Sequence, residues 1–407
     1  MSSSFTWLDY SEQDRRKMLD VVDLFKEQNT RDELGIGAIR DAMAELLFPG
    51  TGTVQTRARY FLFVPWIYLD LERRKKASNE FAAAARAIEI KLIEALARSH
   101  SGQGEGVIGI EARAGLKRLP SNIYWLGLAT WKIRITHGSQ DQFHRSLDRY
   151  YRVMTNRSRS GEAETPVTIL PNWHTGLPAA PDNFPDQANF TLRCGEADYL
   201  RDRIMTSVPT SLLAFLVDKG RDDDAAEYPW FHPQSGQFPA VNRDQLEHAR
   251  NFSEAIHGAA LFYNYLLAEK SVNRERLKQY QDELNVWSEN QAARETEFTQ
   301  WDQQRFWDIV KRDPTVHISL PTQNFVKSWF QLALAPDIAS RLKSHAPARQ
   351  LIQLRERSLK GKLARLENRD ALRNWNGAAG AGRLDYRWRQ AKTIVDDILV
   401  GRKGSNA

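Results

Sequence analysis

Apolar residues recur along this chain with the spacing of α-helices from one end to the other. In residues 79–98, Leu92 and Leu96 fall in phase on one helical face. Residues 243–270 repeat apolar side chains every three or four positions over a longer stretch. The alternation of apolar and polar residues that is typical of strands is almost absent, and residues 316–320 are its best candidate. The sequence therefore predicts a mainly α fold of multi-helix bundle domains.

Start and stop signals divide this pattern into further helices. Ser11 can cap a first helix, whose apolar side chains include Met18 and Phe25. Pro65 is expected to bend or break one helix, and Pro120 is expected to divide another segment into a hairpin. The other predicted helices cover residues 30–47, 54–68, 115–135, 139–153, 195–205 and 209–217, with later breaks at Pro314, Pro336 and Pro347.

Prolines concentrate in one stretch near the middle of the chain, where no apolar period accompanies them. Five of the 16 prolines fall within 20 residues there, which predicts a long connecting loop. The predicted organisation is an N-terminal helical domain (1–156), the Pro-rich linker or loop (157–190), a central helical domain (191–340) and a basic C-terminal helical region (341–407). Three short helices predicted within residues 10–70 have the size of a helix-turn-helix unit, although many small helical bundles share that pattern.

The single cysteine and the lengths of the apolar runs indicate the cellular compartment. Cys194 is the only cysteine, which excludes an intramolecular disulfide and the zinc modules that need several thiolates. The longest apolar run, residues 61–69, is too short to cross a bilayer, and the N-terminus has no basic or apolar leader pattern. We therefore expect a cytoplasmic protein that does not enter a membrane.

The net charge of +6 is unevenly distributed. Residues 341–407 contain 16 Lys and Arg against 6 Asp and Glu, so they carry a net +10 while the preceding 340 residues are slightly acidic. Cations interleaved with aromatic rings suit a phosphate backbone and stacked bases. The predicted nucleic-acid ligands are Arg355, Lys360, Lys362, Arg365 and Arg369, with Trp375 and Trp388 for stacking or packing and Arg57 and Arg59 as a weaker second group. The alternatives are a docking face for an acidic protein and a solvated surface.

Motifs that would indicate catalysis are weak. Residues 104–109 match G-x-G-x-x-G, but they follow a predicted helix and lack the βαβ context of a dinucleotide site. Phosphate-binding loops of the Walker type, H-x-K and H-E-x-x-H do not occur. We expect no cofactor and no metal. An enzyme remains the alternative, with a site gathered from Asp70, Glu89, His144, Glu254 or His257.

Several longer words resemble a bacterial family of proteins of unknown function. They are FTWLDY (5–10), TRDELGIGAIRD (30–41), TRARYFLFVPW (56–66), LPSNIYW (119–125), FSEAIHGAA (252–260) and LDYRW (384–388). The resemblance spans nearly the whole chain. It implies genes that lie in phage-defence clusters beside helicases and phospholipase-D-like nucleases, and it brings no catalytic residues with it.

These observations together favour a non-enzymatic accessory subunit of a bacterial antiviral defence complex. Such a subunit would bind DNA or RNA, scaffold a helicase or nuclease partner, or do both through its basic C-terminal region. The alternative is a metal-dependent nuclease or hydrolase whose site is assembled from scattered Asp, Glu and His residues.

Overall fold

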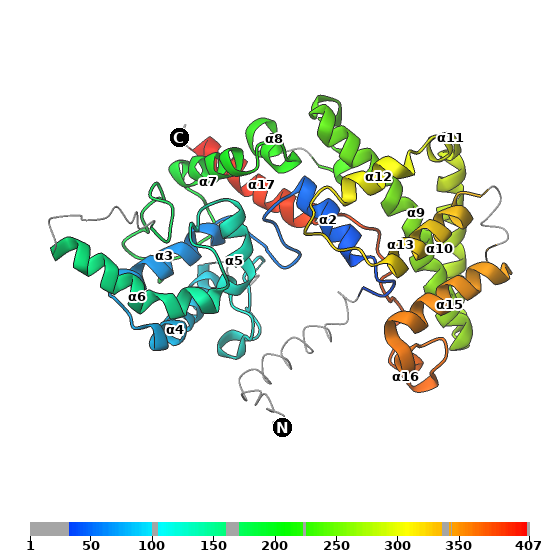
Figure 1. Cartoon of the computed structure of the whole chain (residues 1–407), viewed down its shortest axis with the longest axis horizontal. Helices are drawn as coiled ribbons and strands as arrows, with labels where there is room; N and C mark the ends of the chain where they lie inside the picture. The colour runs from blue at the N-terminus through cyan, green and yellow to red at the C-terminus, as the bar shows by residue number, and fades with distance from the viewer. Residues whose placement is uncertain are drawn as a thin grey trace, which may run out of the picture. The chain divides into compact units, whose positions relative to one another are not determined.

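The computed structural model describes residues 32–99, 105–159, 171–222, 225–335, 342 and 344–404. Across these residues the fold is mainly α, as predicted, and the only β pairing is an isolated bridge between Arg134 and Trp173 (Figure 1). The helix predicted to start at Ser11 lies outside the described residues. Among the described helices, none is both long and apolar enough to span a membrane.

Contacts group the chain into two compact units that are each built from separated segments. Unit 1 combines the described residues up to Ala42 with His248–Leu384, and unit 2 combines Met43–Glu247 with Asp385 to the C-terminus. The prediction instead divides the chain into consecutive domains. Helix α2 (Gly37–Leu47) and helix α9 (Ala240–Lys270) each contribute residues to both units.

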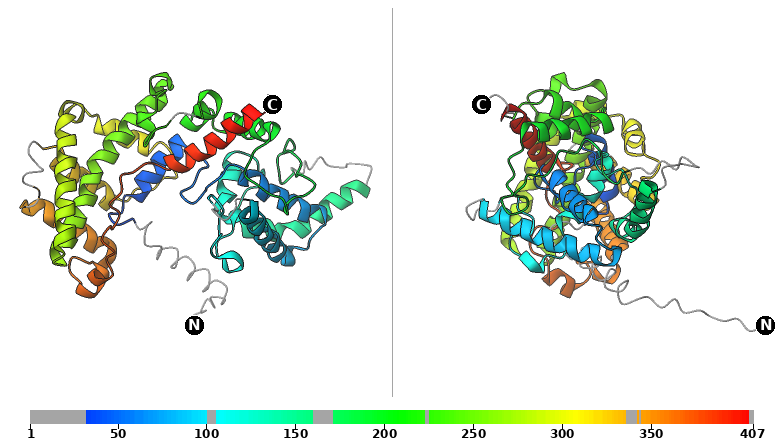
Figure 2. Two further views of the ribbon diagram at one scale, coloured as in Figure 1. Left: turned by 180° about the vertical axis from the view of Figure 1, so that it is seen from behind. Right: turned by 90° about the vertical axis from the view of Figure 1, so that its left-hand side faces the viewer.

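Unit 1 is built around the long helix α9. Helix α10 (Arg274–Ala293) follows it after a short turn and lies alongside it (Figures 1 and 2). Trp287 of α10 and Trp329 both donate indole hydrogen bonds to α9 carbonyl oxygens, at 2.8 Å each. The remaining helices of the unit are α11 (Glu295–Thr299), α12 (Gln303–Val310), α13 (Leu320–Ala333), α15 (Ala346–Lys360), η4 (Gly361–Leu363) and α16 (Arg369–Arg373).

Unit 2 has the aromatic helix α3 (Tyr60–Arg73) at its centre. This helix packs against α4 (Ser78–Ser99) and α5 (Pro120–Thr130), and its residues 60–68 are all buried. Phe61 stacks on Trp131 with ring centroids 3.8 Å apart. The other helices are η1 (Arg113–Gly115), α6 (Gln140–Arg159), α7 (Cys194–Ser207), α8 (Leu212–Lys219), η2 (Pro229–Phe231), η3 (Ser235–Gln237) and α17 (Trp388–Lys403), of which α17 lies along α7 (Figure 2).

The structure shows how three of these local patterns fold. Helix α3 continues through Pro65, so this proline does not break the helix, and its missing N–H removes a single helical hydrogen bond. Pro120 starts α5 instead of dividing a hairpin, because the first turn of a helix does not need that N–H. Residues 316–320, the best candidate for alternation, form no strand, in agreement with the predicted mainly α fold; they lead into α13, whose N-cap Ser319 accepts a hydrogen bond from the Thr322 N–H.

Gly258 of α9 provides a test of the packing in unit 1. A Cβ at this position would lie 2.3 Å from the Trp287 ring, closer than two carbon atoms can approach. We expect Gly258→Ala to lower the free energy of unfolding by about 1–2 kcal/mol, since overpacking outweighs the gain in helix propensity. Gly195→Ala in α7, where nothing lies within 4 Å, is the matched control and should be neutral or slightly stabilising. Chemical denaturation of both variants measures the difference.

Candidate functional site

Arg355, the first predicted phosphate ligand, is buried in unit 1. Its Nε donates to the Leu34 carbonyl oxygen at 2.8 Å, and its Nη2 donates to Gly35 O at 3.0 Å and to Thr322 Oγ1 at 2.8 Å. Burial lowers the pKa of this guanidinium, which lies over the Phe325 ring. The side chain therefore fastens the loop that precedes α2 to helix α15.

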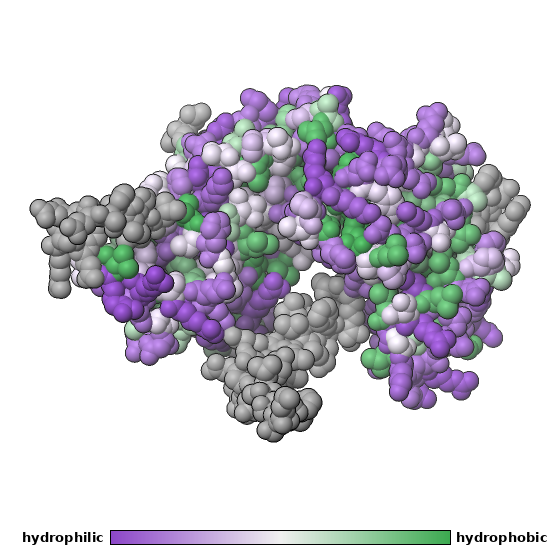
Figure 3. Space-filling view, in the orientation of Figure 1, coloured by the Kyte–Doolittle hydropathy of each residue, from purple (hydrophilic) through white to green (hydrophobic). Residues whose placement is uncertain are grey.

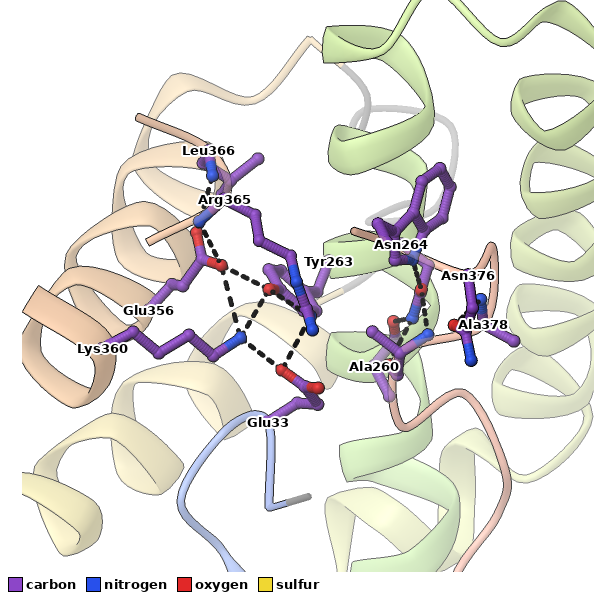
Figure 4. Close-up of polar contacts among 12 residues, drawn as sticks. Glu33, Ala260, Tyr263, Asn264, Glu356, Lys360, Arg365, Leu366, Asn376 and Ala378 are labelled. Carbon is purple, nitrogen blue, oxygen red and sulfur yellow. Dashed lines mark hydrogen bonds and ion pairs between the residues drawn. The ribbon is translucent and has the colours of Figure 1, made fainter. Parts of the chain in front are cut away.

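Lys360 and Arg365 belong to a buried polar cluster with Glu33, Tyr263 and Glu356 (Figure 4). Lys360 Nζ contacts the Glu33 carboxylate and lies 2.8 Å from Tyr263 OH. Arg365 Nη1 donates to Glu33 Oε2 at 3.0 Å. Both cations therefore have an anionic partner that is about 330 positions away in the sequence.

Glu356 lies at the centre of the buried polar cluster, and its side chain has no exposed surface. Its carboxylate accepts hydrogen bonds from Tyr263 OH and from the main-chain N–H groups of Arg365 and Leu366, the last two at 2.9 Å each. Burial, followed by the negative charge of Glu356, raises the pKa of Tyr263, so this hydroxyl stays protonated and donates. The cluster thus fixes the chain that follows α15.

Lys362 and Arg369 are the two predicted phosphate ligands whose side chains are exposed. Lys362 lies in η4, and Arg369 is the first residue of α16. Neither side chain belongs to the buried polar cluster, so a phosphate could contact either of them without breaking it. The nucleic-acid role of all five cations stays a prediction, and these two are the best placed for it.

The two predicted stacking residues lie in different units. Trp375 of unit 1 is half-buried, and its indole donates to Asn264 Oδ1 at 3.1 Å. Trp388 of unit 2 is 2% exposed, packs on Phe48, and donates to the Ala226 carbonyl oxygen at 2.8 Å. Trp388 is therefore a core residue of unit 2.

Arg57 and Arg59, the weaker predicted group, both form ion pairs within unit 2. Arg57 makes a bidentate contact with Asp397 of α17, with Nε–Oδ2 and Nη2–Oδ1 distances of 2.9 and 2.7 Å. Arg59 is 4% exposed and donates to Glu196 at 2.9 Å and to Asn189 Oδ1 at 2.8 Å. Because α3 is buried throughout residues 60–68, it offers no exposed face there for a DNA groove.

Residues 354–373 carry apolar and cationic side chains on the surface of unit 1, and we call them the leucine-and-cation segment. Leu354, Leu359 and Leu363 are 54%, 42% and 69% exposed. Figure 3 shows apolar residues among polar ones on the visible face where α15 and α16 lie. The exposed charges of the segment are Arg357, Lys362, Arg369 and Arg373 against Glu367 and Asp370. The segment therefore combines exposed apolar area with an excess of positive charge.

Glu254 and His257, candidates for an enzyme, have structural partners in unit 1. Glu254 forms ion pairs with Arg250, Arg294 and Arg383. His257 contacts the Ala381 carbonyl oxygen through Nε2 at 3.0 Å, and burial lowers its pKa to about 4. At neutral pH this imidazole is therefore uncharged and holds the chain near residue 381 against α9.

The other enzyme candidates lie in unit 2. Glu89 is fully buried and accepts hydrogen bonds from the N–H and hydroxyl of Ser121, at 2.8 Å each. Burial raises its pKa to about 7. His144 lies 3.2 Å from Tyr68 OH, whereas Asp70 pairs with Arg74 at the surface. Within the described ranges, no three His, Cys, Asp or Glu side chains are placed to hold a metal ion.

A pocket in unit 2 was not predicted from the sequence. Its cavity volume is about 270 Å³, and its wall includes Phe63 and Trp66 of α3 and Arg59, the N-cap residue of that helix. The opposite wall is the Pro-rich loop, which contributes Phe184 and several amide side chains. We call it the aromatic pocket. Proline density indicated a loop, but no local pattern showed that this loop folds over α3.

The buried polar cluster predicts a large loss of stability for Glu356→Ala. The substitution leaves Lys360 and Tyr263 without their shared acceptor and orphans two main-chain N–H groups. Removal of one partner of a buried ion pair costs about 3–5 kcal/mol. Glu367→Ala, at an exposed carboxylate 3.7 Å from Arg357, is the control and should change stability by less than about 1 kcal/mol. Urea denaturation of both variants tests this difference.

Glu89 predicts a pH-dependent difference between the wild type and Glu89→Gln. Because burial raises the pKa of Glu89 in the folded state, the protonated carboxyl favours folding. This contribution to stability is fully present below about pH 4.5 and is lost as the pH rises towards 7. Above pH 7 the Gln variant should therefore be more stable than the wild type, by on the order of 3 kcal/mol. Thermal melting of both proteins between pH 4 and pH 8 measures the effect, and Glu80→Gln on the same helix should not reproduce it.

No curated protein and no solved structure matches this chain. The family of unknown function DUF6361 matches residues 1–399. This match covers almost the whole sequence, including both units of the fold. The chain therefore belongs to the family DUF6361.

Proposed function

We propose that this protein is a non-enzymatic accessory subunit that holds a partner protein on its leucine-and-cation segment. The partner surface would present apolar side chains flanked by Asp and Glu. The antiviral defence complex implied by the family resemblance is the proposed setting, with a helicase or nuclease as partner. The observation that carries the proposal is the exposure of three leucines within ten residues among exposed cations.

Apolar exposure is the first reason for choosing a protein partner. Single exposed leucines are ordinary, but three of them within ten residues provide apolar area that a complex would bury. Burial of such a side chain contributes about 1.5–3 kcal/mol. The surrounding cations would supply orientation and faster association with an acidic partner.

The positions of the predicted phosphate ligands are the second reason. Arg355, Lys360 and Arg365 use their donors on carbonyl and carboxylate oxygens of unit 1. The two predicted phosphate ligands that are exposed would give a slope of only about −1.8 for log affinity against log salt, far weaker than the slope of about −4.5 expected for five phosphate contacts. The other exposed cations of the segment, Arg357 and Arg373, pair with Glu367 and Asp370. The rigid, buried cluster is better suited to present a fixed surface to a protein.

The leucines can be tested with Leu354→Asp/Leu363→Asp. The tagged protein, produced at its native level in the bacterium that carries the gene, is cross-linked, isolated and quantified by mass spectrometry. We expect at least one partner protein to be recovered tenfold less with this variant than with the wild type. Leu320→Asp/Val286→Asp makes the same chemical change at two other exposed positions of unit 1 and should retain the partner.

Three measurements distinguish a protein partner, nucleic-acid binding and the defence setting. Equal recovery of every protein with both double variants would overturn the proposal. A nucleic-acid role would instead appear as salt-dependent binding of labelled DNA or RNA by the purified protein, lost with Lys362→Glu/Arg369→Glu and kept with Leu354→Asp/Leu363→Asp. Counts of phage plaques on cells that carry each variant test the defence setting separately.

A further inference from the structure

We propose that the aromatic pocket of unit 2 binds a nucleobase, with the base stacked on Phe184 and its polar edge on the amide side chains of the Pro-rich loop. This inference does not depend on the leucine-and-cation segment, which belongs to unit 1. The base could come from a free nucleotide or from an unpaired position of single-stranded nucleic acid. Both sources share the chemistry that the pocket offers.

Phe184, the one half-buried ring of the pocket lining, provides the stacking surface. Phe184 lies parallel to Phe63, with ring centroids 5.6 Å apart, and edge-on to Trp66 at 5.2 Å. Phe63 and Trp66 are buried on α3, whereas Phe184 is half-buried on the loop. The Trp66 indole also donates to Pro178 O at 2.7 Å, which fixes the loop against the helix. The ring that a base can reach is therefore Phe184, held in place by the buried rings of Phe63 and Trp66, and stacking on a single ring accepts any base.

The polar side of the pocket complements the edge of a base. Asn183, Gln187 and Asn189 line it from the loop, and each amide side chain carries both a donor and an acceptor. Asn183 donates to Gln187, and Asn189 Oδ1 accepts from Arg59, so the edge of a base, which alternates donors and acceptors, would pair with the donors and acceptors that these contacts leave over. The lining thus favours a ring with polar edges over an apolar side chain.

Charge in the pocket favours a neutral ring inside and an anion at its rim. The guanidinium of Arg59 is neutralised by Glu196 at 2.9 Å, so the buried wall carries no net charge. Its Nε is buried and has no hydrogen-bond partner among the described residues. Arg193, also a lining residue, is exposed and could pair with the phosphate of a nucleotide.

The size of the pocket fits this class of ligand. A cavity of about 150 Å³ is enough to hold benzene. The 270 Å³ of the aromatic pocket exceed that volume but fall below the range of about 300–1,000 Å³ that drug-sized ligands need. A single planar ring system with one or two rings is therefore the appropriate occupant.

Titration calorimetry on the full-length protein tests the proposal with adenosine, guanosine, cytidine and uridine 5′-monophosphates. Ribose 5-phosphate, which lacks a base, is the control ligand. We expect binding of at least one nucleotide and none of the sugar phosphate. Absence of heat with all four nucleotides at millimolar concentration, or equal binding of ribose 5-phosphate, would overturn the proposal.

Two substitutions locate the binding. Phe184→Leu keeps an apolar side chain in the loop but removes its ring, and it should weaken nucleotide binding at least fivefold with little change in melting temperature. Asn183→Asp replaces an exposed amide and should also weaken binding. Phe231→Ala changes another exposed ring of unit 2 and should have no effect. Unchanged affinity in both pocket variants would refute the assignment.

A single-stranded oligonucleotide separates the two sources of the base. If the pocket serves nucleic acid, the oligonucleotide should bind at least tenfold more tightly than any mononucleotide, with a salt dependence that the mononucleotide lacks. Equal affinities would assign the pocket to a free nucleotide. In either case, Phe184→Leu must weaken the binding, because the base occupies the same wall.

Discussion

Buried charged side chains need hydrogen-bond or ion-pair partners, and this requirement fixes how several helices of the structure are arranged. A buried carboxylate such as Glu356 is tolerated only when donors surround it, and unit 1 supplies a hydroxyl, an ammonium group and two main-chain N–H groups. Those donors come from α9, from α15 and from the chain after η4. Their convergence holds these elements together, and Arg355 adds the loop before α2. The surface next to them, with its exposed leucines, is therefore presented by a fixed backbone.

Unit 2 meets the same constraint with smaller groups of charges placed among aromatic rings. Arg57 pairs with Asp397, and Arg59 pairs with Glu196, so the residues just before α3 are connected to α17 and α7 by ion pairs. Each guanidinium also lies over a ring, Arg57 over Phe190 and Arg59 over Phe63. Stacking and ion pairing together position the wall of the aromatic pocket. Arg59, which lines the pocket, is thus held by both a carboxylate and a ring.

Helix positions were largely predictable because the apolar period is a local property. Residues 79–98 were expected to be helical, and α4 covers Ser78–Ser99. The environment of the cations was not predictable, since their partners are distant in the sequence. Nothing near Arg365 indicates that Glu33 lies beside it, and nothing near Arg59 indicates Glu196. Local charge counting assigned both arginines to solvent or phosphate, whereas the fold gives each a carboxylate.

The distant partners of the C-terminal cations have a consequence for how this protein should be divided. A peptide of residues 341–407 would lack Glu33 and Tyr263, the groups that accept hydrogen bonds from Lys360 and Arg365 in the whole chain. Its arginines and lysines would return to water and attract polyanions without specificity. Part of the affinity of such a fragment for nucleic acid would therefore be created by the truncation itself, and the fragment would overstate the affinity of the intact protein.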